Sequence, residues 1–246
     1  MRMFWRVLSS ERLKMSKSFI WLLIIGSPVV AIAVGLLANI QEEGQPLTWD
    51  MLLGVMSVFH AMMFLPVLSG VFAALICRAE HADGGWKMLL ALPVTRTSVY
   101  LAKYTMIMSL MAAVQLLFFA AVFGVGLLRG VDMPVPWTLF FSSCFGGWLA
   151  CLPLAALQLA VSQSWSSFGA PLALNVSFTL PNMLIANSST YGPYYPWVQP
   201  LLAMSSFGEE RFGAFNLPLE SLLIVVFGSL LVFLSVGLFS FWRKAV

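Results

Sequence analysis

Long runs of apolar residues alternate with short polar segments along this chain. A helix needs about 20 apolar residues to cross the hydrocarbon core of a bilayer. The pattern predicts six membrane-spanning helices at about residues 19–40, 51–77, 99–128, 137–161, 168–186 and 219–241. The predicted fold is therefore an all-α integral membrane protein, in which residues 1–246 form a single transmembrane domain.

Two of the predicted spans contain residues that disturb a regular helix. Pro66 predicts a kink in the second span, because proline has no N–H to donate to the preceding turn. In the fifth span, Pro171, Asn175, Pro181 and Asn182 predict an irregular or partly unwound helix. Two interpretations stay open: simple kinking, or a break that lines a substrate path, since irregular backbone inside a membrane must be covered by protein or water.

The first 18 residues interleave basic and apolar side chains ahead of the first span. The basic residues are Arg2, Arg6, Arg12, Lys14 and Lys17, and the apolar ones are Phe4, Trp5, Leu8, Leu13 and Met15. This pattern predicts an amphipathic helix that lies on the anionic face of a membrane.

The polar segment between the second and third spans, residues 78–98, carries a small apolar stripe of its own. Trp86, Leu89 and Leu90 recur at positions i, i+3 and i+4, which places them on one face of a short helix. Two interpretations fit such a helix. It lies on the bilayer surface with the stripe in lipid, or a soluble partner grips the stripe.

The residues around this stripe set the ends of the short helix and favour one interpretation. Asp83 is suited to cap its first turn, Pro93 to stop it, and Thr95 or Thr97 to cap the helix that follows. Acidic side chains are disfavoured beside anionic headgroups, yet Glu80 and Asp83 stand at an otherwise basic membrane face. The two acids therefore favour docking in a partner, where they can pair with basic residues.

Composition supports a membrane protein with very little soluble mass. The chain is 60% hydrophobic and 9% charged, with a mean hydropathy of +0.91, whereas a soluble domain carries about 25% charged residues. The three cysteines, Cys77, Cys144 and Cys151, fall in or at the ends of apolar segments, and we interpret them as packing residues.

The basic residues predict the orientation. With six spans, both termini share one side with residues 78–98 and 162–167, and only Arg129 and Arg211 of the 13 basic residues lie on the other side. The shared side holds Arg2, Arg6, Arg12, Lys14, Lys17, Arg78, Lys87, Arg96, Lys103, Arg243 and Lys244. Because loops rich in Lys and Arg stay inside the cell, we expect both termini and the short helix to be cytoplasmic.

The sequence lacks the residues that several kinds of chemistry require. No charged side chain lies deep in a predicted span, which argues against an ion-coupled transporter. We find no metal-binding cluster, no GxSxG and no GxxxxGK[ST], so we expect no catalytic, metal or cofactor-binding residues, no enzyme activity and no nucleic-acid partner. The intramembrane His60 is interpreted as a hydrogen-bonded packing residue.

Aromatic residues gather in the long loop before the last span. Tyr194, Tyr195 and Trp197 stand there among prolines. They fit a belt of aromatic rings at the headgroups, and they also fit an amphipathic lid that meets an amphiphilic substrate.

The chain resembles the type-2 ATP-binding-cassette permeases. The resemblance rests on six spans, an amphipathic entry helix, and the motif formed by Glu80, Asp83-Gly84-Gly85, the segment Leu89–Arg96 and Lys103. It implies that the short helix is a coupling helix, with Glu80, Asp83, Trp86, Leu89 and Leu90 meeting a cytoplasmic ATPase subunit. It also implies that ATP is bound by that partner, and that the permease pairs with a second copy or a paralogous permease.

A second patch resembles the bacterial lantibiotic-immunity permeases. It consists of Pro181-Asn182, the segment Tyr194–Pro200 and Met204. Such permeases work with a cytoplasmic ATPase and remove antimicrobial peptides from the membrane, which implies a place in the bacterial cell membrane and a role in self-immunity.

We therefore expect a permease subunit of an ATP-driven exporter for a hydrophobic or amphiphilic substrate, because its spans lack charges to solvate a hydrophilic one. Tyr194, Tyr195 and Trp197 are the candidate substrate or lid residues. The alternatives are an anchoring or structural membrane subunit without transport, an exporter of another substrate such as a drug or a lipid, and a membrane-embedded enzyme, for which no nucleophile or metal cluster is present.

Overall fold

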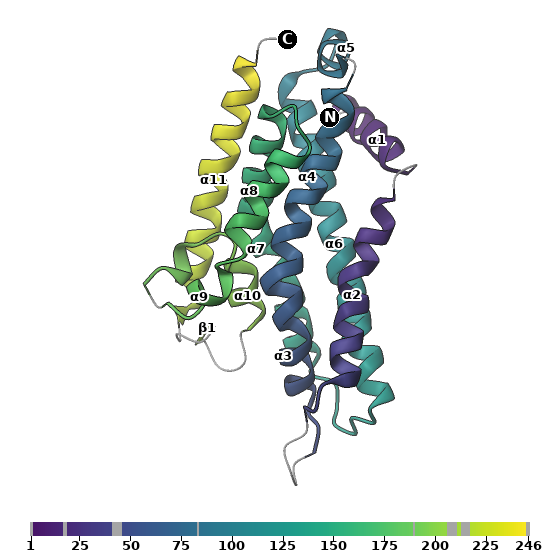
Figure 1. Ribbon diagram of the computed structural model, residues 1–246, viewed down its shortest axis with the longest axis vertical. Coiled ribbons are helices and arrows are strands. Elements are labelled where there is room, and N and C mark those ends of the chain that lie inside the picture. Colours follow the sequence, from purple (N-terminus) through teal and green to yellow (C-terminus); the bar gives the residue numbers. More distant parts are fainter. Residues whose placement is uncertain are drawn as a thin grey trace.

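The computed structural model describes residues 2–16, 19–40, 46–82, 84–188, 190–205, 211–212 and 217–244. Helices run side by side in one elongated bundle (Figure 1). They are α1 (Arg2–Ser16), α2 (Ile20–Leu37), α3 (Trp49–Phe59), the π-helix η1 (His60–Phe64), α4 (Leu65–His81), α5 (Gly85–Ala91), α6 (Arg96–Leu128), α7 (Trp137–Ser164), α8 (Gly169–Thr179), α9 (Asn182–Ile185), the 3-10 helix η2 (Gly192–Tyr194), α10 (Gln199–Met204) and α11 (Leu219–Arg243). Two short strands, β1 (Arg211–Phe212) and β2 (Leu217–Pro218), pair antiparallel.

Five helices among the described residues are long and apolar enough to cross a membrane. They are Ile20–Leu37, Trp49–His81, Arg96–Leu128, Trp137–Ser164 and Leu223–Arg243, and each overlaps a predicted span. The predicted fifth span, residues 168–186, is not one helix, because a turn at Leu180 and Pro181 divides it into α8 and α9. The predicted break is therefore present, and a span at residues 168–186, which would make the total six, stays a prediction.

The helix through residues 49–81 contains its own irregular turn. Pro66 has no N–H, so the carbonyl of Met62, four residues earlier, loses its helical donor. The chain widens into η1 just before this proline. Asn182 donates from Nδ2 to the Met62 carbonyl at 2.8 Å, and Asn175 donates to the Pro66 carbonyl at 2.9 Å. The predicted distortion at Pro66 thus takes the form of a π-turn, which side chains of α8 and α9 complete.

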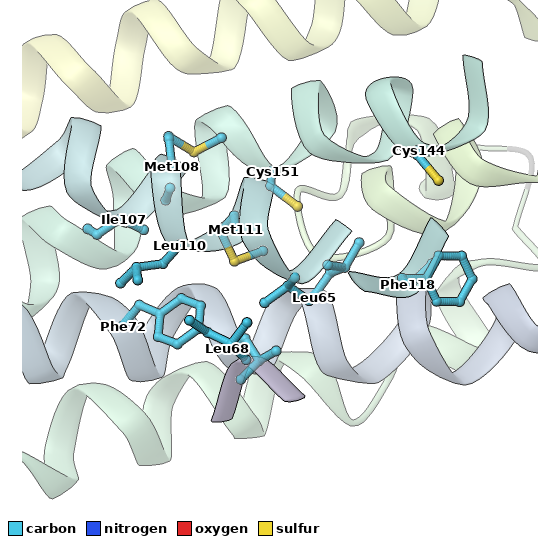
Figure 2. Close-up of a cluster of buried hydrophobic side chains, with 14 of the residues drawn as sticks. Leu65, Leu68, Phe72, Ile107, Met108, Leu110, Met111, Phe118, Cys144 and Cys151 are labelled. Carbon is cyan, nitrogen blue, oxygen red and sulfur yellow. The ribbon is translucent and has the colours of Figure 1, made fainter. Parts of the chain in front are cut away.

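The apolar core lies where α4, α6 and α7 meet. Figure 2 shows side chains of α4 facing those of α6, with the cysteines of α7 beside them. The buried residues labelled there include Leu65, Leu68, Phe72, Ile107, Met111, Phe118 and Cys151. All three cysteines of the chain are buried and unbridged, in agreement with their interpretation as packing residues.

The two ends of the bundle differ in what they carry. One end, here called the α5 end, holds α1, α5 and the last turn of α11 (Figure 1). The opposite end, here called the α10 end, holds α9, α10 and the turn between α6 and α7. Arg129 in that turn donates to the carbonyls of Gly35 and Ala38, which closes the free end of α2.

Candidate functional site

The short helix α5 folds back on the end of α4 at the α5 end of the bundle. Gly84 precedes it with φ 72°, a left-handed conformation that glycine adopts without steric cost. A Cβ on Gly85 would lie 2.8 Å from the Ala79 carbonyl oxygen, so this close return needs glycine. The N-cap position is Gly84, which corrects the prediction of an Asp83 cap; Asp83 lies outside the described residues.

The far end of α5 follows the sequence prediction more closely. The helix ends at Ala91, two residues before Pro93. The Thr95 side chain then accepts a hydrogen bond from the Ser98 N–H at 3.2 Å and caps α6. The stop predicted at Pro93 and the cap predicted at Thr95 are both confirmed.

The Trp86 side chain faces the protein's own bundle and is 6% exposed. Its ring meets that of Phe241 at a centroid distance of 5.3 Å, and its Nε1 donates to Nδ1 of His81 at 3.3 Å. Leu89 and Leu90 are half-buried against the same core. In this structure the apolar stripe is the internal side of α5, and contact of the stripe with a partner stays a prediction.

The outward face of α5 carries a different apolar pair. Met88 is 72% exposed and Leu92 is 55% exposed, with Lys87 and Ala91 exposed beside them. The sequence reasoning missed this pair, although Met88 and Leu92 are four residues apart and therefore share a face. The available signal was their position opposite the Trp86 stripe.

Four charged side chains form a buried cluster beside Trp86. This ion-pair cluster consists of Glu11, Lys14, Glu80 and Lys103. Lys103 Nζ lies 3.0 Å from Glu11 and 2.9 Å from Glu80, and Lys14 Nζ lies 2.9 Å from Glu11 and 2.6 Å from Glu80. Two acids and two bases balance in charge, which buried ions require.

The cluster shows where the two acids lie. Glu80 is 3% exposed and pairs within the chain, and its predicted contact with a partner stays a prediction. Glu11 is fully buried on the side of α1 that faces the bundle. The signal for its burial was the spacing of Val7, Glu11 and Met15, which recur every four residues and form the inner face of α1.

Electrostatics favour the charged state of Lys14 at the rim of the cluster. Burial opposes a charge on its ammonium group, but the carboxylates of Glu11 and Glu80 outweigh that cost and raise the pKa of Lys14 above its ordinary value. The ion pairs of α1 therefore persist throughout the physiological pH range.

Contacts around Trp86 link α5 to several long helices. Lys103 of α6 lies 5.6 Å from the Trp86 ring centroid, and Lys244, after α11, lies 4.4 Å from it. The Lys244 ammonium also donates to the Gln163 carbonyl of α7. Together with the ion-pair cluster on α1, α4 and α6, these contacts make a joint between α5 and five helices, α1, α4, α6, α7 and α11.

The three candidate lid residues do not form one surface. Tyr194 is 71% exposed and points away, whereas Tyr195 donates from its hydroxyl to the Phe178 carbonyl at 2.7 Å. Trp197 is 6% exposed, stacks on Phe178 at 5.0 Å and donates from Nε1 to Oδ1 of Asn175 at 2.8 Å. The Trp197 side chain is thus part of the internal packing, and contact of this residue with a substrate stays a prediction.

A neutral polar cluster lies around Asn175, and we call Gln158, Asn175, Asn182 and Trp197 the amide cluster. Oδ1 of Asn175 accepts from Trp197 and from Nε2 of Gln158 at 2.8 Å each. Asn182 donates to the Trp197 carbonyl at 3.0 Å. The cluster therefore joins the broken segment α8–α9 to α4, α7 and the loop before α10.

His60 belongs to a separate chain of hydrogen bonds. Its Nδ1 lies 2.6 Å from the Ser27 hydroxyl, its Nε2 lies 3.0 Å from Oε1 of Gln115, and its ring stacks on Phe118 at 3.9 Å. These partners agree with its interpretation as a packing residue. Within the described part of the chain, no three His, Cys, Asp or Glu side chains are grouped so that they could hold a metal ion.

A family model described as "ABC-2 family transporter protein" matches residues 7–182, which is more than half of the chain. The matched range includes all of α5, Trp86 and the ion-pair cluster, and it ends before Tyr194, Tyr195 and Trp197. No curated protein has a significant match to the chain.

Proposed function

Because the chain belongs to the ABC-2 transporter family, we propose that it carries a hydrophobic or amphiphilic substrate out through a bacterial cell membrane. Membership makes it a multi-pass permease subunit of an ABC exporter rather than an enzyme in itself, and such permeases normally work with a cytoplasmic ATPase partner. That separate subunit binds and hydrolyses ATP, and this chain converts its motion into transport.

One observation carries this proposal: α5 is exposed on one face and tied to five helices on the other. Met88 and Leu92 form the exposed apolar pair, with Lys87 beside them. We assign docking in the ATPase to this outward face and assign transmission to Trp86 and the ion-pair cluster. Movement of the ATPase would then displace α5 and, through the buried joint, the membrane helices.

The distribution of charge supports a cytoplasmic α5 end and cytoplasmic termini. Among described residues, the elements at that end carry Arg2, Arg6, Arg12, Lys14, Arg78, Lys87, Arg96, Lys103, Arg243 and Lys244. At the α10 end they carry Arg129 and Arg211. An excess of Lys and Arg on the cytoplasmic side is the usual arrangement in membrane proteins.

An apolar groove between α6 and α7 supports the proposed class of substrate. It measures about 370 Å³ and is lined by Leu116, Phe119, Phe141, Phe145 and Trp148, with Gln115 as its polar side chain. A groove of this kind suits an apolar surface and offers no ion pair to a hydrophilic solute. It joins the hydrocarbon region, so a substrate dissolved in the membrane can reach it.

The identity of the substrate is the finer part of the proposal. A lantibiotic-type peptide, removed for self-immunity, is an amphiphile of the proposed class, and a drug or a lipid is the alternative. Asn182 and Trp197 belong to the patch that resembles the lantibiotic-immunity permeases. Inside the bundle, the Asn182 side chain donates a hydrogen bond to the Trp197 carbonyl. They support a shared architecture rather than a substrate contact. We propose that a second copy or a paralogous permease completes the transport path.

Recovery of the ATPase tests the docking assignment. The variant Met88→Asp/Leu92→Asp should lower the amount of ATPase that copurifies with the permease by roughly tenfold, since buried apolar anchors dominate protein interfaces. The control is Met133→Asp, an exposed methionine at the α10 end. Recovery of the ATPase at the wild-type level, with matched permease in the membrane, would contradict docking through α5. A wild-type complex that never hydrolyses ATP would favour the anchoring alternative.

Labelling of introduced cysteines tests the orientation. Ser164→Cys at the α5 end should resist a membrane-impermeant thiol reagent applied to intact cells, whereas Met133→Cys at the α10 end should react. The native cysteines are buried and contribute little background. Labelling of the Ser164 variant from outside would reverse the proposed orientation.

A further inference from the structure

A cleft between α1, α2 and α6 opens at the α5 end of the bundle. It measures about 480 Å³ and lies apart from the apolar groove between α6 and α7. α1 contributes Ser9 and Arg12, α2 contributes Trp21, and α6 contributes Met106, Leu110 and Ala113. Figure 1 shows α1 set at an angle to the long helices.

The cleft is polar at its rim and mostly apolar deeper inside. Ser9 and Arg12 supply a hydroxyl and a guanidinium group from α1. The wall on α6 from Met106 to Ala113 runs for about 10 Å along the helix axis, at 1.5 Å per residue, toward the middle of the bundle. A cationic rim above an apolar slot matches an amphiphile with an anionic head.

The charge at the rim is unopposed. Arg12 is exposed and has no hydrogen-bond or ion-pair partner among the described residues. The one acid of α1, Glu11, points inward and is neutralised by Lys14 and Lys103. The outer face of α1 therefore presents cations without a neighbouring carboxylate, and a guanidinium group pairs strongly with a phosphate.

The position of the cleft along the bundle also fits the headgroup region of a bilayer. Trp5 and Trp21 line it and are 62% and 57% exposed. Tryptophan is enriched at the boundary between headgroups and hydrocarbon, where its ring is apolar and its N–H is wet. The two rings place the rim at that boundary and the slot in the hydrocarbon.

We propose that this cleft binds one anionic phospholipid of the leaflet on the α5 side. Its phosphate pairs with Arg12 and Ser9, and an acyl chain lies between α2 and α6 against Leu110 and Ala113. Such a lipid would join α1 to the bundle from the outside, next to the ion-pair cluster that joins them from the inside. The site is independent of the transported substrate and of the docking assignment for α5.

Native mass spectrometry of the purified chain tests this site. The protein is given equal amounts of phosphatidylglycerol and phosphatidylcholine with identical acyl chains. We expect preferential retention of one phosphatidylglycerol per chain. Arg12→Gln should weaken that retention roughly tenfold, as expected for loss of one charge-assisted hydrogen bond, whereas Lys87→Gln, a cation of the same end outside the cleft, should retain it.

A second variant addresses the apolar slot. Ala113→Trp fills the space against α2 and should also lower retention, while Val236→Trp on the exposed side of α11 should not. Phosphatidylglycerol with a photoreactive acyl chain should label α2 and residues 106–113. Equal retention of the two lipids, equal losses in Arg12→Gln and Lys87→Gln, or labelling confined to α7 and α11 would each overturn the proposal. Because Ala113→Trp leaves the charge in place, it decides the outcome if Arg12→Gln fails to fold.

Discussion

The ion-pair cluster and the amide cluster both join helices that are far apart in the sequence, but one uses charged side chains and the other neutral ones. The charged cluster lies near helix ends: Glu80 is in the last turn of α4, and Lys103 is two turns into α6. The amide cluster reaches Pro66, in the middle of the helix that spans residues 49–81.

The difference follows from the cost of burying each kind of group. A charge buried at mid-membrane costs several kcal/mol more than one near headgroups and water, whereas a neutral amide needs only hydrogen-bond partners. The amide of Asn182 also donates to the Met62 carbonyl that Pro66 has left open, which an ionised acid could not do. The charged joint and the neutral joint should therefore respond differently to mutation.

The largest effect should come from unbalancing the ion-pair cluster. Lys103→Met leaves the carboxylates of Glu11 and Glu80 with Lys14 alone, and we expect a loss of about 3–5 kcal/mol in the free energy of unfolding. Titration of the purified chain with sodium dodecyl sulfate measures this loss. Adding Glu11→Gln restores the charge balance and should recover most of the stability. A double variant no more stable than Lys103→Met would show that charge balance is not what the cluster supplies.

One buried tryptophan in each region, Trp86 and Trp197, gives a matched comparison of the two. Trp86 and Trp197 are each 6% exposed and each donate one hydrogen bond, so replacement of either by alanine should cost about 3 kcal/mol of unfolding free energy. Only Trp86→Ala should alter ATP hydrolysis by the complex in liposomes, measured per folded permease, because only Trp86 belongs to the α5 joint. Equal changes in hydrolysis for both variants would remove the distinction between the regions.

Loss of an amide should cost less than loss of a charge. Asn175→Leu removes the acceptor of the Trp197 N–H and of the Gln158 amide, and we expect a loss of about 2 kcal/mol in the same titration. Asn187→Leu is the control, since the exposed Asn187 side chain bonds only to the Met183 carbonyl of its own turn. If the two variants lose the same stability, the amide cluster does not hold α8 against α4.

The smallest effect should come from the rim of the ion-pair cluster. The Lys14 side chain is 32% exposed and water screens its ion pairs, so Lys14→Met should cost about 1 kcal/mol. The folded-state pKa of Lys14 is raised, so its contribution is fully present below the unfolded pKa and is lost as the pH rises through the folded value. The difference between wild type and Lys14→Met should be constant from pH 6 to 9 and should shrink only in strong alkali. If the stability difference between wild type and Lys14→Met shrinks between pH 6 and 9, the ion pairs of Lys14 are not its source.

Local sequence determined the elements of this protein. Apolar runs located the long helices, Pro66 and Pro181 located the irregular turns, and Thr95 located the start of α6. Each of these follows from forces that act within a few residues: the length needed to cross hydrocarbon, the missing N–H of proline, and a side chain that caps its own helix.

The tertiary structure alone decided which side of each amphipathic helix faces inward. A stripe such as Trp86 with Leu89 looks the same whether lipid, a partner or the chain itself covers it, and here the end of α11 covers it. The spacing of Glu11 with Val7 and Met15 marks one face of α1, but that this face is the inner one was hidden, since the partner Lys103 lies 92 residues away. A charge can enter a bundle only where the opposite charge arrives with it, and that arrival depends on how the helices pack, which no local pattern encodes.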